Sequence, residues 1–219
     1  MRTIVSGLAI WALLWSPVDA SEKIPRPLPE THRAIANLEL GITSREELFR
    51  LLGPAQSWPR PDQHHDAFRY CYELRSTNPT WLVVGFGWMY SFEILNSVAV
   101  TNRKQDLKGP CVEARFNASE ISTSGGLQLG ISRDEVDSAI GDDPTSVGKI
   151  LRYDYESYEE YPQPIRQPES DFLYVGEYHY GAIEITLEEE SVARFFIWLG
   201  GEPEWKVVSS PNKALQRTP

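Results

Sequence analysis

Two histidines and the carboxylates beside them are the first residues that could do chemistry. His64 and His65 lie in a proline-flanked loop between Asp62 and Asp66. Imidazole and carboxylate groups are good metal ligands, but adjacent histidines rarely bind one ion together. We therefore interpret this segment as a solvated loop, with a metal site as the alternative, and predict neither a metal nor a cofactor.

The acidic and hydroxyl side chains form no recognisable catalytic pattern. Neighbouring carboxylates occur at 142–143, 159–160 and 188–190, all in predicted turns, where such groups are normally solvated. Serines at 122–124 and 209–210 lie in linkers, outside the strand–turn–helix setting of an activated nucleophile. The sequence therefore favours a non-enzymatic protein, and a hydrolase with a nonstandard site is the alternative.

Aromatic residues on the predicted strands of the second half are the strongest binding candidates. A sheet that helices cover on one face leaves its other face open to water, and an exposed aromatic patch marks an interaction surface. The alternative is that helices and the neighbouring unit cover both faces. The candidate binding residues are Tyr153, Tyr155, Tyr174, Tyr178, Tyr180 and Trp198.

The two cysteines of the chain are Cys71 and Cys111. Cysteines of an exported protein are expected to pair, and such a bridge would contribute about 3–4 kcal/mol to stability. Two free, buried thiols are the alternative. Neither cysteine has the nearby base and positive charge that a nucleophilic thiol requires.

The N-terminus predicts export. Residues 1–20 combine Arg2, an apolar stretch too short to span a bilayer and small residues at a cleavage site, which is typical of a signal peptide. An uncleaved N-terminal anchor is the alternative. We expect a periplasmic or secreted protein without membrane insertion after signal cleavage. The net charge of −10 disfavours nucleic acid as a partner. A proline-rich leader at 21–36 and a disordered tail at 209–219 complete the ends.

An internal repeat organises the rest of the chain. LELGITSRE at 38–46 is echoed by LQLGISRDE at 127–135, and three further blocks recur in the same order. Such self-similarity predicts a duplicated structural unit. We therefore expect repeat unit 1 at 38–102, a linker at 103–126 and repeat unit 2 at 127–208.

Each unit is predicted to open with a short helix and to continue as strands. The helices begin at capping boxes, Thr43 with Glu46 and Ser132 with Glu135. Alternating aromatic and polar residues indicate the strands, and the prolines at 162–168 indicate a loop. The strands are predicted at 68–74, 81–90 and 93–102 in unit 1, and at 149–158, 172–180, 182–187 and 192–199 in unit 2.

The glycine-isoleucine-hydroxyl-x-x-glutamate phrase at 41–46 and 130–135, followed by a glycine and aromatic strands, resembles a known family. It is similar to the unit of secreted beta-lactamase inhibitor proteins and of SmpA/OmlA outer-membrane assembly lipoproteins. The resemblance implies an α+β fold of two tandem repeats, each a short helical segment packed on a small antiparallel sheet. It also implies a concave aromatic surface that grips a partner.

These features predict an exported protein-binding module that acts through its aromatic sheet surface, with enzyme inhibition as one form of that activity. The expected partner is an unidentified envelope or secreted protein. Besides the hydrolase, a structural role in envelope maintenance is an alternative.

Overall fold

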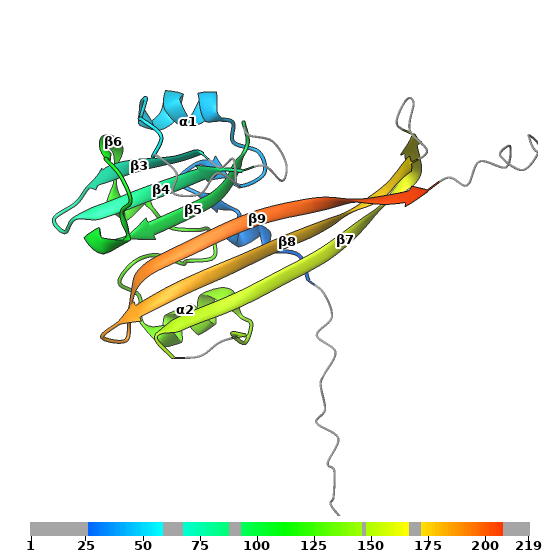
Figure 1. Ribbon diagram of the computed structural model, residues 1–219. Coiled ribbons are helices and arrows are strands. Elements are labelled where there is room, and N and C mark those ends of the chain that lie inside the picture. The colour runs from blue at the N-terminus through cyan, green and yellow to red at the C-terminus, as the bar shows by residue number, and fades with distance from the viewer. Residues whose placement is uncertain (1–25, 59–67, 88–92, 146–147, 167–171, 208–219) are drawn as a thin grey trace, which may run out of the picture.

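The computed structural model describes residues 26–58, 68–87, 93–145, 148–166 and 172–207. Their main element is one seven-stranded mixed sheet with the strand order β6-β3-β4-β5-β9-β8-β7 (Figure 1). The strands are β3 (Phe68–Arg75), β4 (Thr80–Phe86), β5 (Leu95–Thr101), β6 (Val112–Asn117), β7 (Ile150–Arg166), β8 (Phe172–Glu188) and β9 (Ser191–Val207).

Smaller elements surround this sheet. The helices are α1 (Arg45–Leu52) and α2 (Arg133–Ile140), and a short hairpin joins β1 (Ala34–Ile35) to β2 (Leu38–Glu39). Three 3-10 turns lie at η1 (Glu30–His32), η2 (Lys104–Asp106) and η3 (Ala118–Glu120). No helix in the described ranges has the length and apolar character needed to cross a membrane.

The predicted α+β fold, with a separate small sheet in each repeat, is wrong. β5 pairs antiparallel with β9, with Val98 opposite Ile197 and Val100 opposite Phe195, so the strands of both halves form one sheet. Two separate open sheets would each leave unpaired backbone groups along two edges. Joining β5 to β9 satisfies two of those edges, and the result is a sheet-rich protein.

The helix starts confirm one predicted cap and correct the other. Ser132 and Glu135 form the expected capping box at α2, where each side chain bonds the other residue's backbone amide. At α1 the cap is Ser44, which accepts a hydrogen bond from the Glu47 amide. Thr43 instead accepts from the amide of Glu39 at 2.7 Å, because the chain makes a tight turn just before the helix.

Both helix entries are tied to the sheet by a similar pair of backbone hydrogen bonds. The Gly41 amide donates to Leu95 and the Leu95 amide to Thr43, both at 2.8 Å. In the second half, the Gly130 amide donates to Val192 and the Val192 amide to Ile131, both at 2.9 Å. The similar segments thus make similar contacts, while their origin by duplication stays a prediction.

One hydrophobic core runs beneath both halves of the sheet. α1 contributes Leu48 and Leu52, and α2 contributes Val136 and Ile140, to the same buried cluster. Between the helices, this cluster includes inward-facing residues of the central strands, among them Phe195 of β9. The helices therefore cover one face of a shared sheet, and neither half has a core of its own.

The predicted linker at 103–126 contains a strand that the sequence pattern did not indicate. Its β6 pairs parallel with β3, and the disulfide between Cys71 and Cys111 anchors the segment before it, which confirms the predicted cysteine pairing. Cys71 packs with Trp58 and Trp81 in a small second cluster. This cluster lies on the sheet face opposite the core, because Cys71 alternates with the core residues on either side of it.

The strands of the second half are longer than predicted. β7 continues through the predicted loop to Arg166, and β8 runs without a break across 172–188. Figure 1 shows the far ends of β7, β8 and β9 continuing past the helices and the other strands as a three-stranded projection. We call this part, residues 156–166, 172–181 and 199–207, the ribbon.

Removing the disulfide should destabilise the protein. Replacing both Cys71 and Cys111 with Ala should lower the free energy of unfolding by about 3–4 kcal/mol, because the bridge joins residues 40 positions apart and constrains the unfolded chain. Urea denaturation followed by tryptophan fluorescence measures this loss. Reduction of the wild-type protein should reproduce it, whereas an unchanged denaturation midpoint in the variant would contradict the prediction.

Candidate functional site

Two of the predicted binding tyrosines lie in the core. Tyr153 and Tyr155 of β7 expose only 1% and 6% of their surface, and both belong to the main hydrophobic cluster. Their face of β7 is the one that α2 and the leader cover, and there Tyr153 lies opposite Ile183 of β8. Their aromatic faces are therefore not available as an exposed surface, contrary to expectation.

The opposite face of the same strands carries an aromatic row outside the core. Tyr158 lies directly opposite Tyr178, with ring centroids 4.8 Å apart, and Tyr178 stacks on Tyr180 at 6.3 Å. Closer to the body, this face continues with half-buried aromatic residues of β9. We call this set the open face; it consists of Tyr158, Tyr178, Tyr180, Phe196 and Trp198.

Sequence reasoning missed two members of the open face, Tyr158 and Phe196. Both could have been found from side-chain alternation along a strand, since residues two apart point to the same face. Tyr158 thus shares a face with Asp154 and Glu156, and Phe196 shares a face with Trp198. The predicted β7 ended at residue 158, which hid the role of its final tyrosine.

Tyr174 does not lie on the open face. A bulge between Tyr174 and Gly176 shifts the strand register by one residue, and such a shift moves a side chain to the other face. The Tyr174 hydroxyl donates to the Glu177 carboxylate at 3.2 Å, and its ring packs on Tyr161 at 5.0 Å. Because Glu177 precedes Tyr178 in β8, this second pair lies on the reverse side of the ribbon.

Carboxylates surround the aromatic rings of the open face. The Tyr158 hydroxyl donates to Glu204 at 2.5 Å, and this hydrogen bond raises the pKa of Tyr158 to about 12. Desolvation, followed by the charges of Glu202 and Glu156, raises the pKa of Tyr180. The phenols of Tyr158 and Tyr180 are therefore harder to ionise than usual, and the open face combines aromatic rings with the negative charge of the surrounding carboxylates.

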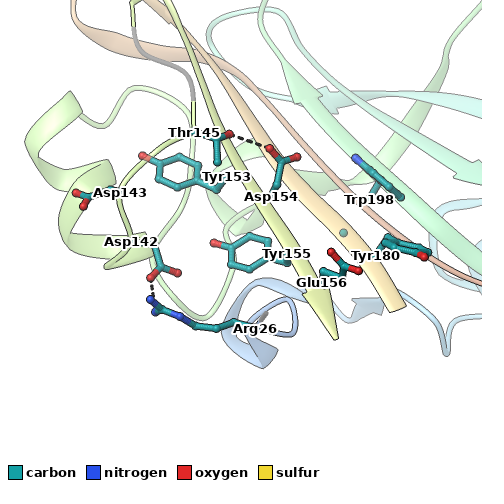
Figure 2. A pocket seen from close by; sticks show the side chains of 11 residues that line it. Arg26, Asp142, Asp143, Thr145, Tyr153, Asp154, Tyr155, Glu156, Tyr180 and Trp198 are labelled. Carbon is teal, nitrogen blue, oxygen red and sulfur yellow. Dashed lines mark hydrogen bonds and ion pairs between the residues drawn. The ribbon is translucent and has the colours of Figure 1, made fainter. Parts of the chain in front are cut away.

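A cavity of about 420 Å³ lies at the root of the ribbon, beside Tyr180 and Trp198 (Figure 2). β7 is the edge strand of the sheet, so the cavity reaches side chains from both of its faces. The leader passes along this edge. There the Arg26 carbonyl accepts from the Glu156 amide at 2.9 Å, and the Arg26 guanidinium donates to Asp142 at 2.6 Å.

Two buried hydroxyls point toward this cavity. Figure 2 shows the rings of Tyr153 and Tyr155 extending from β7 toward the segment that follows α2. Neither hydroxyl has a hydrogen-bond partner in the part of the chain that the structure describes. Burial, together with the nearby Asp137 carboxylate, raises the pKa of Tyr153 to about 12. Burial and the Asp142 charge raise the pKa of Tyr155 further.

A serine, a histidine and a glutamate also come together on the ribbon. Ser157 lies opposite His179 on the neighbouring strand, and the His179 Nε2 atom is 3.6 Å from a Glu159 oxygen. In a hydrolase such a carboxylate would have to hold the imidazole in place. Glu159 is 69% exposed and its oxygen lies beyond hydrogen-bond distance, so this carboxylate does not hold the imidazole rigidly.

The alternative metal site of the sequence analysis has no counterpart among the described residues. Among the described residues, no group of three or more histidines, cysteines or carboxylates is arranged to hold a metal ion. The candidate loop with His64 and His65 lies outside those residues, as do the predicted signal peptide and tail. Comparison with protein families, curated proteins and solved structures found no significant match, so the family resemblance stays a prediction.

The unpartnered hydroxyl of Tyr155 predicts an unusual response to mutation. Tyr155→Phe should leave stability unchanged or raise it by about 1 kcal/mol, because it removes a buried polar group that lacks a partner. The matched control is Tyr72→Phe. The Tyr72 hydroxyl donates to the Gly53 carbonyl at 3.0 Å, so its loss should cost about 1 kcal/mol. Chemical denaturation measures both, and equal losses would contradict the prediction.

The buried phenols also predict a loss of stability in alkali. In the unfolded chain these groups titrate at about pH 10, while in the folded protein the pKa of Tyr153 is about 12 and that of Tyr155 is raised as well. Their stabilising effect is therefore complete below about pH 10 and is lost as the pH rises through the folded-state values. Thermal unfolding at stepped pH should show a smaller alkaline loss in the Tyr153→Phe/Tyr155→Phe variant than in wild type.

Proposed function

We propose that this protein is an exported, non-enzymatic module that binds a protein partner through the open face of its ribbon. The observation that carries the proposal is the row of Tyr158, Tyr178 and Tyr180, which lies outside the core and continues into Trp198. The partner is an envelope or secreted protein, and inhibition of an enzyme is one form that this binding takes.

The ordered backbone and restricted side chains of the ribbon suit protein recognition. Its strands pair continuously around Tyr158, Tyr178 and Tyr180, and the β7–β8 register shifts only beyond Glu160, so these side chains stand on a backbone that is already ordered. Tyrosine and tryptophan give large contact areas at a small cost in side-chain entropy, and both are enriched at the energetic centres of interfaces. Ring stacking between Tyr178 and Tyr180 restricts the rings further, which lowers the entropy lost on binding.

The covalent structure supports the proposed location. A disulfide between Cys71 and Cys111 is compatible with an oxidising compartment outside the cytoplasm. The acidic composition, with 31 Asp and Glu against 21 Lys and Arg, disfavours nucleic acids and anionic lipids and favours a partner with basic side chains. A periplasmic or secreted protein without a membrane segment after signal cleavage fits these properties.

Substitutions on the open face should abolish partner capture without unfolding the protein. Tyr158→Ala combined with Tyr178→Ala should weaken binding by about 2 kcal/mol or more, because tyrosines at the centre of an interface contribute this much. The immobilised protein would be exposed to envelope extract, and the retained proteins identified by mass spectrometry. A thermal melt of each variant checks folding.

Tyr161→Ala is the matched control, since Tyr161 lies on the same ribbon but packs with Tyr174 on its reverse side. It should retain the captured proteins. Equal capture by wild type and the Tyr158→Ala/Tyr178→Ala variant would contradict the proposed function, as would a matching loss in Tyr161→Ala.

A further inference from the structure

The cavity at the root of the ribbon carries an excess of negative charge. Four carboxylates line it, and Arg26 is the one cationic side chain in its lining among the described residues; the carboxylates are those of Asp142, Asp143, Asp154 and Glu156. Asp142 is paired with Arg26, and Asp154 is paired with Arg152 at 2.7 Å. Asp143 and Glu156 have no ion pair within the described ranges, so the cavity can accept further positive charge.

The hydroxyl of Tyr155 gives a second, independent indication of a ligand. Its side chain is more than nine-tenths buried and lines the cavity, and the hydroxyl lacks a partner in the described structure and points toward Asp142 and the segment after α2 (Figure 2). A buried hydroxyl without a hydrogen bond is costly. Because the phenol oxygen can accept a hydrogen bond, a group rich in N–H donors would satisfy it.

We propose that this cavity receives the guanidinium group of an arginine side chain on the protein partner. The proposal rests on the proposed function, because the cavity adjoins the open face at Tyr180 and Trp198. A partner seated on those aromatic residues could extend one side chain around the edge of β7. Arginine is the side chain whose length and planar fork of donors suit this reach.

The protein already holds one guanidinium at this place. Arg26 donates from Nη1 to the Asp142 carboxylate, so the wall of the cavity accommodates the planar fork and its charge. A second guanidinium that reaches around the edge of β7 is attracted by Asp143, and the Tyr155 hydroxyl can accept one of its N–H groups. An anionic or neutral polar group would not gain the attraction of Asp143.

The proposal is tested by NMR titration of the full chain with two blocked tripeptides, one with arginine and one with citrulline at its centre. Citrulline keeps the shape of arginine but carries no charge. The arginine peptide should shift resonances around Tyr155 and Asp142 and bind at least about tenfold more tightly than the citrulline peptide. Equal binding of the two peptides would overturn the proposal, because it would show that the cavity does not select the charge.

Variants separate the cavity from the rest of the fold. Tyr155→Phe should weaken the arginine peptide about tenfold, because it removes a hydrogen bond to a charged group. Tyr72→Phe, whose hydroxyl bonds Gly53, should leave the affinity unchanged. Asp143→Asn supplies a second probe on an exposed residue, and it should weaken binding and flatten its salt dependence. Unchanged affinity in both cavity variants would refute the arginine site.

The outcome is distinguishable from a failure of the proposed function. If the arginine peptide does not bind but the Tyr158→Ala/Tyr178→Ala variant still loses its partner, the open face binds a protein that does not use the cavity. If the peptide binds and the open-face variant keeps every captured protein, the cavity recognises arginine without the ribbon.

Discussion

The antiparallel pairing of β5 with β9 is the constraint on which the rest of the structure depends. It places β9 between the two halves, so that the face of β9 lined by Phe195 and Ile197 completes a core shared with α1 and α2. Since one face of the joined sheet is committed to this core, side-chain alternation assigns every second residue of β7, β8 and β9 to the other face. The open face is a direct consequence of that division.

The division also explains why the cavity lies where it does. Tyr153 and Tyr155 belong to the core face, and β7 is the edge strand of the sheet, so their hydroxyls lie at the margin of the core, facing the segment that follows α2. The leader closes part of this edge through Arg26, which bonds both Glu156 and Asp142. Buried hydroxyl groups without a complete set of hydrogen bonds therefore lie beside the cavity, which is typical of functional sites.

Local features of the fold could be predicted from the sequence, whereas long-range pairing could not. The Ser132–Glu135 capping box and the alternating strand at Phe68–Arg75 follow from short patterns that depend on neighbouring residues. The β5–β9 junction, the parallel strand β6 and the bulge before Gly176 depend on contacts between distant segments. The candidate site was therefore predicted only in part. Tyr178, Tyr180 and Trp198 share a face as expected, while strand parity and the bulge placed Tyr153, Tyr155 and Tyr174 elsewhere.

The ribbon is attached to the rest of the protein at one end only, so burial differs between its base and its tip. Beside its base, Ile183 is fully buried, whereas at the tip Phe172 is 47% exposed, so we expect amide exchange to be slower at the base than at the tip. Substitutions in the distal part of these three strands should therefore cost less folding stability than substitutions beside the core.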